Sequence, residues 1–147
     1  SPYLGVDSID PFISHSGKGV FILCRTSNPS GAEFQNMAMK NNKTLYESVA
    51  SWANNLNTKD NIGLVVGATA PEELSAVRNI APELPLLIPG IGAQGGDLEQ
   101  SIRVGNSTGI GIINVSRSIS FAGNLSKSDI KKSAIAYVSR MNEALNE

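Results

Sequence analysis

Four short apolar runs alternate with longer amphipathic stretches along the chain. The runs span residues 19–24, 62–67, 86–88 and 110–115, and turn-forming or polar residues bound each of them. Continuous apolar runs of this length are typical of strands buried on both faces of a parallel sheet. We therefore predict four parallel strands at these positions.

The stretches between the runs carry apolar residues at steps of three and four, which indicates helices. Most of these stretches begin with a helix start signal, either a capping-box pattern or a capping aspartate. The signals are Thr44-x-x-Glu47, Thr69-x-x-Glu72, Asp97 and Ser126-x-x-Asp129. We also expect a helix from Asp7 or Ser8 through Ile13.

The predicted order is one helix and then four strand–helix units. Short buried strands alternating with amphipathic helices indicate an α/β fold built from parallel units with right-handed crossovers. Ligands in such folds bind beyond the carboxyl ends of the strands. The loops that follow the strands are therefore the place to look for chemistry.

Composition excludes several classes of partner. The 147 residues are 41% hydrophobic and 17% charged, with a net charge of −1, so we expect a folded chain with no nucleic-acid partner. No apolar run approaches the roughly 20 residues of a membrane helix, so we expect no membrane partner. Cys24 is the only cysteine, which favours a reducing, cytoplasmic location.

The loop after the first strand is long and polar. Thr26, Ser27 and Asn28 open a segment that runs to Lys43 before the next helix. Hydroxyl and amide groups at a strand end can bind the edge of a heterocycle, and long loops are often functional. An ordinary Asn-Pro turn is the structural alternative.

The loop after the third strand is rich in glycine and proline, from Pro89 to Asp97. Glycines such as Gly95 and Gly96 allow backbone N–H groups to approach an anion. A tight turn is the alternative. The loop also matches G-x-G-x-x-G, but the position about 20 residues later offers Arg117 and no carboxylate, which leaves a weak NADP-type reading.

Arg117 and Ser116 follow the fourth strand. An arginine there suits a phosphate monoester, which its guanidinium can bind in bidentate fashion. A surface arginine paired with a carboxylate is the alternative. In (β/α)₈ barrels the loops after strands seven and eight commonly form a phosphate site. A glycine-rich loop followed one strand–helix unit later by an arginine matches that arrangement.

Groups suited to acid–base or metal chemistry are missing from these loops. His15 is the single histidine and is expected in a solvated loop on the opposite face. Cys24 is expected as a buried apolar residue. Asp129 and Lys131 belong to the first turn of the last helix, as a cap and a solvated charge. No metal-ligand spacing is present.

Together these segments resemble the orotidine 5′-phosphate decarboxylase family, in its longer bacterial and protist form. The most specific matches are Thr-Ser-Asn-Pro at 26–29 and Pro-Gly-Ile-Gly-Ala-Gln-Gly-Gly-Asp at 89–97. Further matches, in the family's order, lie at residues 2–8, 17–25, 63–69, 71–74, 86–88 and 114–117.

The resemblance implies a homodimeric (β/α)₈ barrel that converts orotidine monophosphate to UMP and CO₂ without metal or organic cofactor. It implies that Ser27, with Thr26 beside it, binds the pyrimidine edge and that Gln94 bridges base and phosphate. It implies that Arg117 holds the phosphate with backbone N–H groups near Ser116 and at Gly95 and Gly96. Asp7 would border the site.

The family's catalytic Lys and Asp residues, including an Asp-x-Lys-x-x-Asp motif, have no counterpart in the predicted strands. We therefore expect no catalytic residue in this chain. We expect residues 1–147 to form the second half of one barrel, strands five to eight with their helices, and not an independent domain. A full barrel needs about 250 residues, so the expected partner is an N-terminal half on a separate or cleaved chain.

Two other functions remain open from the sequence. One is a non-catalytic, flavodoxin-like module that binds a nucleotide phosphate. The weaker one is a fragment of an NADP-dependent oxidoreductase. A second chain that carries the Asp-x-Lys-x-x-Asp motif would favour the decarboxylase.

Overall fold

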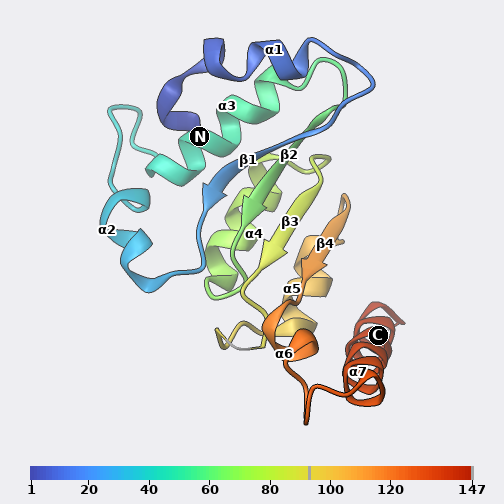
Figure 1. Ribbon diagram of the computed structural model, residues 1–147. Coiled ribbons are helices and arrows are strands. Elements are labelled where there is room, and N and C mark those ends of the chain that lie inside the picture. The colour runs from blue at the N-terminus through green and yellow to red at the C-terminus, as the bar shows by residue number, and fades with distance from the viewer. Residues whose placement is uncertain (93, 147) are drawn as a thin grey trace.

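A four-stranded parallel sheet forms the centre of the computed structural model, which describes residues 1–92 and 94–146 (Figure 1). The strands lie side by side in chain order, and every neighbouring pair is parallel. They are β1 (Val20–Arg25), β2 (Ile62–Val66), β3 (Leu86–Pro89) and β4 (Gly111–Asn114). The four predicted strands are thus confirmed, with each end within one residue of its expected position.

Helices connect the strands. The α-helices are α1 (Asp10–Ile13), α2 (Ala32–Gln35), α3 (Leu45–Leu56), α4 (Pro71–Ile80), α5 (Leu98–Gly105), α6 (Arg117–Ser120) and α7 (Lys127–Asn146). Short 3₁₀ turns lie at Pro2–Leu4, Val6–Ser8 and Pro29–Gly31. The first predicted helix therefore begins at Asp10, later than expected, because 3₁₀ turns occupy the preceding residues. None of the helices in the described ranges is long and apolar enough to cross a membrane.

Three of the predicted helix starts form. Thr44 and Glu47 make both hydrogen bonds of a capping box at α3. At the start of α5, the Asp97 carboxylate accepts from the backbone N–H of Gln100 at 2.9 Å. The Ser126 and Asp129 side chains bond at the start of α7, at 2.8 Å.

The capping box predicted at Thr69 is wrong. Helix α4 begins at Pro71 after Ala70, which makes no side-chain cap. The Thr69 hydroxyl instead donates to the carbonyl oxygen of Ser27, at 2.8 Å. The Thr69 hydroxyl, which the local pattern predicts to cap the helix, is therefore engaged in a contact between two loops.

The core lies between the sheet and the helices on one of its faces. Figure 1 shows α4 and α5 behind the sheet. Leu64 and Leu86 from the strands and Leu74 and Val77 from α4 are all fully buried there. Burial of side chains of this size contributes about 1.5–3 kcal/mol each, which explains why the sheet and these helices form together.

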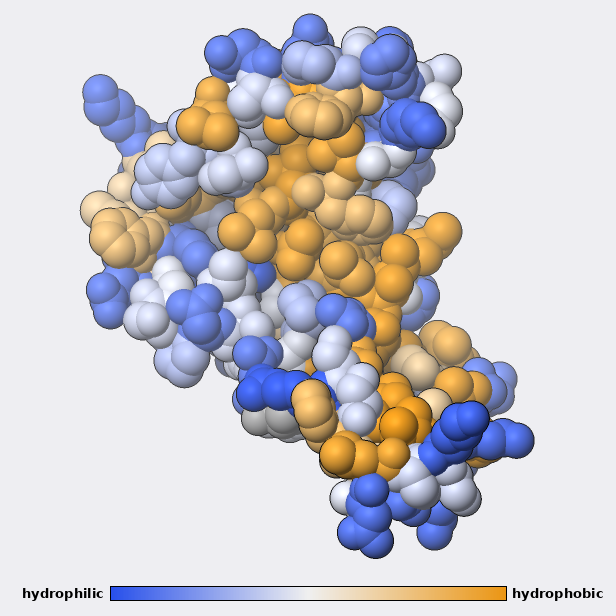
Figure 2. All heavy atoms as spheres, viewed as in Figure 1, coloured by the Kyte–Doolittle hydropathy of each residue, from blue (hydrophilic) through white to orange (hydrophobic). Residues whose placement is uncertain are grey.

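The opposite face of the sheet is uncovered within the described residues. Phe21, Leu23 and Ile112 alternate with the core residues and are 43%, 45% and 42% exposed. Figure 2 shows an apolar band across the middle of this view of the molecule. The expectation of strands buried on both faces therefore holds for one face only, because no described segment packs on the other.

Buried Arg78 ties the loops together at the amino end of the sheet. Its guanidinium donates to carbonyl groups that follow α4 and to two carbonyl groups that flank the α5–β4 loop. The acceptors are Ala81, Pro82, Leu84, Gly105 and Ile110, at 2.6–3.3 Å. This clamp fixes the entry of β3 and β4 at the amino end of the sheet, away from the loops that follow the strands.

Candidate functional site

The loops after β1, β2 and β3 meet at the carboxyl end of the sheet. The Ser27 hydroxyl, after β1, donates to Gln94 Oε1, after β3, at 2.8 Å. The Thr69 hydroxyl, after β2, donates to the Ser27 carbonyl oxygen at 2.8 Å. Ser27 is therefore held by both neighbouring loops, as expected for parallel strands that end at one edge.

Two glycines allow this close approach. A Cβ atom at Gly67 would lie 2.6 Å from the Ser27 backbone nitrogen, and one at Gly90 would lie 2.9 Å from the Ser27 Cβ. Gly90 also has a φ of +100°, which side chains other than glycine rarely adopt. Ser27 can therefore take this position because Gly67 and Gly90 have no side chains.

A cavity of about 160 Å³ lies between the loops after β3 and β4. Its lining includes Pro89, Gln94, Ser116 and Arg117. Arg117 is exposed and forms no ion pair within residues 1–92 and 94–146. Its cationic fork is therefore available to an anion in this cavity.

A larger cavity of about 380 Å³ is also lined by Gln94. Arg25, Ser27, Asn28, Pro29, Thr69 and Gln94 line it. The side-chain amide of Asn28 donates within its own loop, to the Ser30 hydroxyl at 3.3 Å. Because Gln94 lines both cavities, one side chain can contact both parts of a ligand that spans them.

Thr26 is turned toward its own loop. Its amide donates to Gln35 Oε1 at 2.9 Å, and its hydroxyl accepts from Gln35 Nε2 at 2.9 Å. Thr26 is not among the residues that line the two cavities. The structure therefore brings it beside Ser27, with its polar groups engaged by Gln35.

The glycine-rich loop is closed by its own hydrogen bonds. The Gly95 amide donates to the Gly92 carbonyl oxygen at 2.8 Å, and the Gly96 amide donates to that of Gly90 at 3.1 Å. A phosphate would have to share or displace these donors. The expected phosphate contacts at Gly95 and Gly96 remain predictions.

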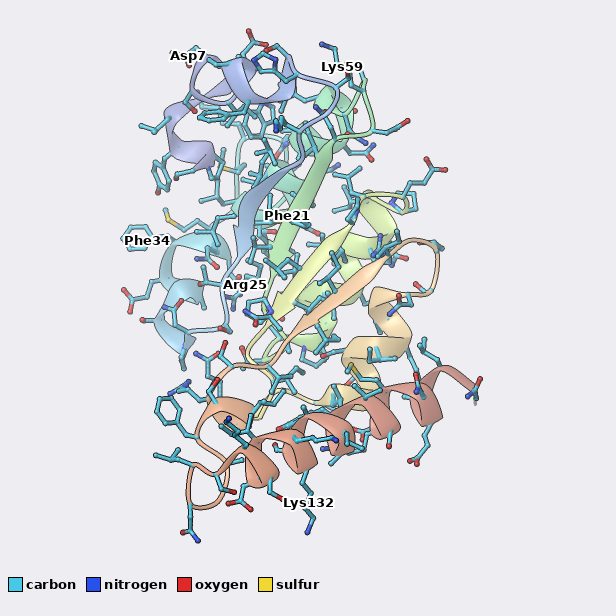
Figure 3. All side chains as sticks on the ribbon, turned by 45° about the vertical axis from the view of Figure 1, so that its right-hand side comes forward. Asp7, Phe21, Arg25, Phe34, Lys59 and Lys132 are labelled. Carbon is cyan, nitrogen blue, oxygen red and sulfur yellow. The ribbon has the colours of Figure 1, made fainter. Side chains whose placement is uncertain are left out.

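Asp7 lies far from this site. Figure 3 shows it at the top of the molecule, toward the end of the sheet opposite Arg25. Asp7 lines neither of the two cavities, and the expectation that it borders the complete site stays a prediction.

Neither cavity is lined by a carboxylate or a lysine within the described residues, and those residues contain no cluster of His, Cys, Asp and Glu suited to a metal ion. Cys24 is buried, and desolvation raises the pKa of its thiol to about 12, so it is no nucleophile at neutral pH. His15 is exposed in the loop before β1. Among the described residues, the lining of the two cavities offers a cationic guanidinium, hydroxyls and amides, but no carboxylate or lysine.

The family model for the orotidine 5′-phosphate decarboxylase / HUMPS family matches residues 1–128. The chain belongs to this family. A curated orotidine 5′-phosphate decarboxylase from Natronomonas pharaonis is 54% identical over 123 residues, which cover 84% of this chain and 45% of the relative.

Solved structures of this family share the fold. The Leishmania donovani UMP synthase matches with a TM-score of 0.78 and 38% identity, covering 95% of this chain and 32% of that one. The Methanocaldococcus jannaschii decarboxylase, solved with the inhibitor BMP, matches with a TM-score of 0.64 and 25% identity, covering 88% and 55%. The chain thus spans about half the length of the curated decarboxylases that it matches.

The site residues that sequence reasoning missed are Arg25, Gln35 and Thr69. Arg25 carried a signal, because a charged residue directly ends an apolar strand. Gln35 carried none, since its contact with Thr26 depends on the path of the loop. The pattern around Thr69 predicts a helix cap and gives no sign of the contact with Ser27.

Proposed function

We propose that this chain supplies the nucleotide-binding loops of an orotidine 5′-phosphate decarboxylase. The observation that carries the proposal is the contact between Ser27 and Gln94 at the junction of two cavities, one of which is also lined by Arg117. A pyrimidine nucleotide has two matching ends, a polar heterocycle and a phosphate monoester. Ser27 and Asn28 suit the first, and Arg117 with Ser116 suits the second.

In the proposed mechanism this chain binds and orients, and it does not transfer protons. Binding of the phosphate, remote from the reacting carbon, supplies free energy that closes loops and orders the site around the pyrimidine. The lack of a carboxylate or lysine in the lining supports a division of labour. The catalytic Lys and Asp residues then belong to an N-terminal barrel half.

The uncovered face of the sheet supports such a partner half. A second four-stranded unit could pair with the free edges of β1 and β4 and cover Phe21, Leu23 and Ile112, which would close an eight-stranded barrel. Residues 1–147 then form strands five to eight of one domain, and two complete barrels form the expected homodimer. We expect this assembly in the cytoplasm.

A decarboxylation assay tests the proposal. The chain is purified together with an N-terminal half that carries Asp-x-Lys-x-x-Asp, and the loss of orotidine monophosphate absorbance is followed. We expect activity from the complex and none from either half alone. An inactive complex that is folded and contains both halves would contradict the proposal.

A non-catalytic nucleotide-phosphate-binding module is the second candidate, favoured by the same lack of acid and base groups. It predicts a monomeric chain that unfolds cooperatively and binds UMP without a partner. Size-exclusion chromatography with a UMP titration distinguishes the two, because the decarboxylase half binds UMP well only after it is assembled.

A further inference from the structure

A β-bulge changes the direction of one side chain at the end of β1. Leu23 pairs with Val65 and Arg25 pairs with Val66, so Cys24 is the extra residue of the bulge. Regular alternation would leave Arg25 exposed like Leu23, yet Cys24 and Arg25 are both only 5% exposed. Bulges near functional sites often re-aim a side chain in this way.

The re-aimed guanidinium lies beneath the loop that carries Ser27. Arg25 Nη1 donates to the Thr26 carbonyl oxygen at 2.7 Å and to Gln35 Oε1 at 3.0 Å. The same Gln35 oxygen accepts from the Thr26 amide at 2.9 Å. Thr26 is thus held at its carbonyl by Arg25 and at its amide and hydroxyl by Gln35. Figure 3 shows Arg25 at the carboxyl end of β1, where this loop begins.

Burial of this arginine carries a free-energy penalty that its ion pair offsets only in part. Its ion-pair partner, Glu73 of α4, has Oε1 3.5 Å from Nη2, and Arg25 Nε has no partner within the described residues. A buried charge with incomplete pairing is often less stable than an apolar side chain of similar volume. Core packing therefore does not explain an arginine here, whereas the need for a forked donor under Thr26 does.

We propose that Arg25 is a positioning residue that fixes Ser27 for the nucleotide, with Gln35 as the relay. Arg25 holds Thr26, and Thr26 holds the next residue, Ser27, whose hydroxyl meets Gln94. Its effect on ligand binding rests on the function proposed above. Its effect on the order of the loop does not.

The first test measures nucleotide binding in the chain assembled with its N-terminal half. Arg25→Met keeps an unbranched stem and removes the guanidinium donors, and Gln35→Ala removes only the relay from a partly buried position. We expect the Kd for UMP and the KM to rise about tenfold or more in both variants, because small misplacements weaken binding and catalysis strongly. Arg140→Met, which breaks the exposed ion pair with Glu99 on α5, is the control and should leave both constants unchanged.

The KM readout separates positioning from simple loss of structure. A variant that merely folded poorly would lower the apparent kcat through its folded fraction and leave the KM unchanged. If the KM and the Kd for UMP stay within twofold of wild type in both variants, Arg25 does not position the site.

The second test does not depend on the decarboxylase reaction. Hydrogen exchange of the Thr26 amide is measured in the assembly in which the chain is purified. We expect exchange to be at least tenfold faster in Arg25→Met and Gln35→Ala, while the Leu86 amide, bonded to Ile110 at 2.8 Å, stays protected. If the wild-type assembly binds no UMP, the proposed function fails. If exchange of the Thr26 amide is unchanged in Arg25→Met and Gln35→Ala, the positioning role of Arg25 fails, whatever the outcome for UMP.

Discussion

Ser27 and Gln94, which are 67 positions apart in the chain, are joined by a hydrogen bond of 2.8 Å at the carboxyl end of the sheet. This bond links the loops after β1 and β3, and it lies where the two cavities of the candidate site meet. A ligand that occupies both cavities must contact or replace it.

The contact predicts that Ser27 and Gln94 act as one unit in ligand binding. We expect Ser27→Ala and Gln94→Ala each to raise the Kd for UMP by up to about tenfold, the scale of one hydrogen bond of about 0.5–1.5 kcal/mol. The double variant should lose less than the sum of the two, since the contact is already lost in each single variant. Isothermal titration of the assembled enzyme measures the cycle. Fully additive losses would show that the two residues bind independently, and Ser139→Ala on the exposed face of α7 is the control.

Arg117 is expected to carry the charge contact with the phosphate. Arg117→Ala in the assembled enzyme should lower kcat/KM. The loss should correspond to about 1.5–3 kcal/mol of transition-state binding free energy, the scale of a hydrogen bond to a charged group. Steady-state kinetics measure the loss, with Arg140→Ala as a control for the removal of a distant arginine. A near-wild-type kcat/KM would exclude the phosphate role.

Arg78 is expected to stabilise the fold without contacting ligand. Arg78→Met leaves several buried carbonyl groups without their donor, so the free energy of unfolding should fall by about 3–5 kcal/mol. Urea unfolding measures this, with Arg140→Met as the matched control. Because Arg78 binds loops at the amino end of the sheet, the folded fraction should bind UMP with unchanged affinity. A large loss of affinity in folded protein would contradict that separation.

The capping box at α3 predicts a pH dependence of stability. The Thr44 amide and hydroxyl donate to the Glu47 carboxylate and lower the pKa of Glu47 below its ordinary value of 4.5. A lowered folded-state pKa stabilises the fold above pH 4.5, and this contribution is lost as the pH falls through the folded value. Glu47→Gln should therefore be less stable than wild type at pH 7, by part of the roughly 1 kcal/mol that a cap contributes.

Urea unfolding at pH 7 and pH 3 checks this expectation. The difference between wild type and Glu47→Gln should shrink at the lower pH, because protonation removes the wild-type charge at this position as the pH falls through the lowered pKa. Glu143→Gln, on the exposed side of α7, is the control. An equal difference at both values would show that the charge of Glu47 has no part in the cap.

Local patterns predicted the parts of the fold that depend on local physics. Apolar runs predicted the four strands, and the Thr44 capping box formed because its two partners lie within one helical turn. The same parallel-strand argument anticipated that Ser27, Gln94 and Arg117 lie at one edge of the sheet. Their binding roles stay predictions.

The errors come from contacts between distant segments. Thr69 matched a helix cap as well as Thr44 did, but its hydroxyl met Ser27 from a loop 42 positions away. The burial of Arg25 follows from a bulge that no alternation of apolar residues could reveal.

The uncovered face of the sheet has a consequence for the chain in isolation. Phe21, Leu23 and Ile112 form an apolar surface between two strand edges with unpaired backbone groups, the combination that promotes association between copies. Free chain should thus cluster as its concentration rises and should bind hydrophobic dyes and chaperones. The concentration of the chain relative to that of the partner that covers this face then decides what fraction of the chain stays unaggregated.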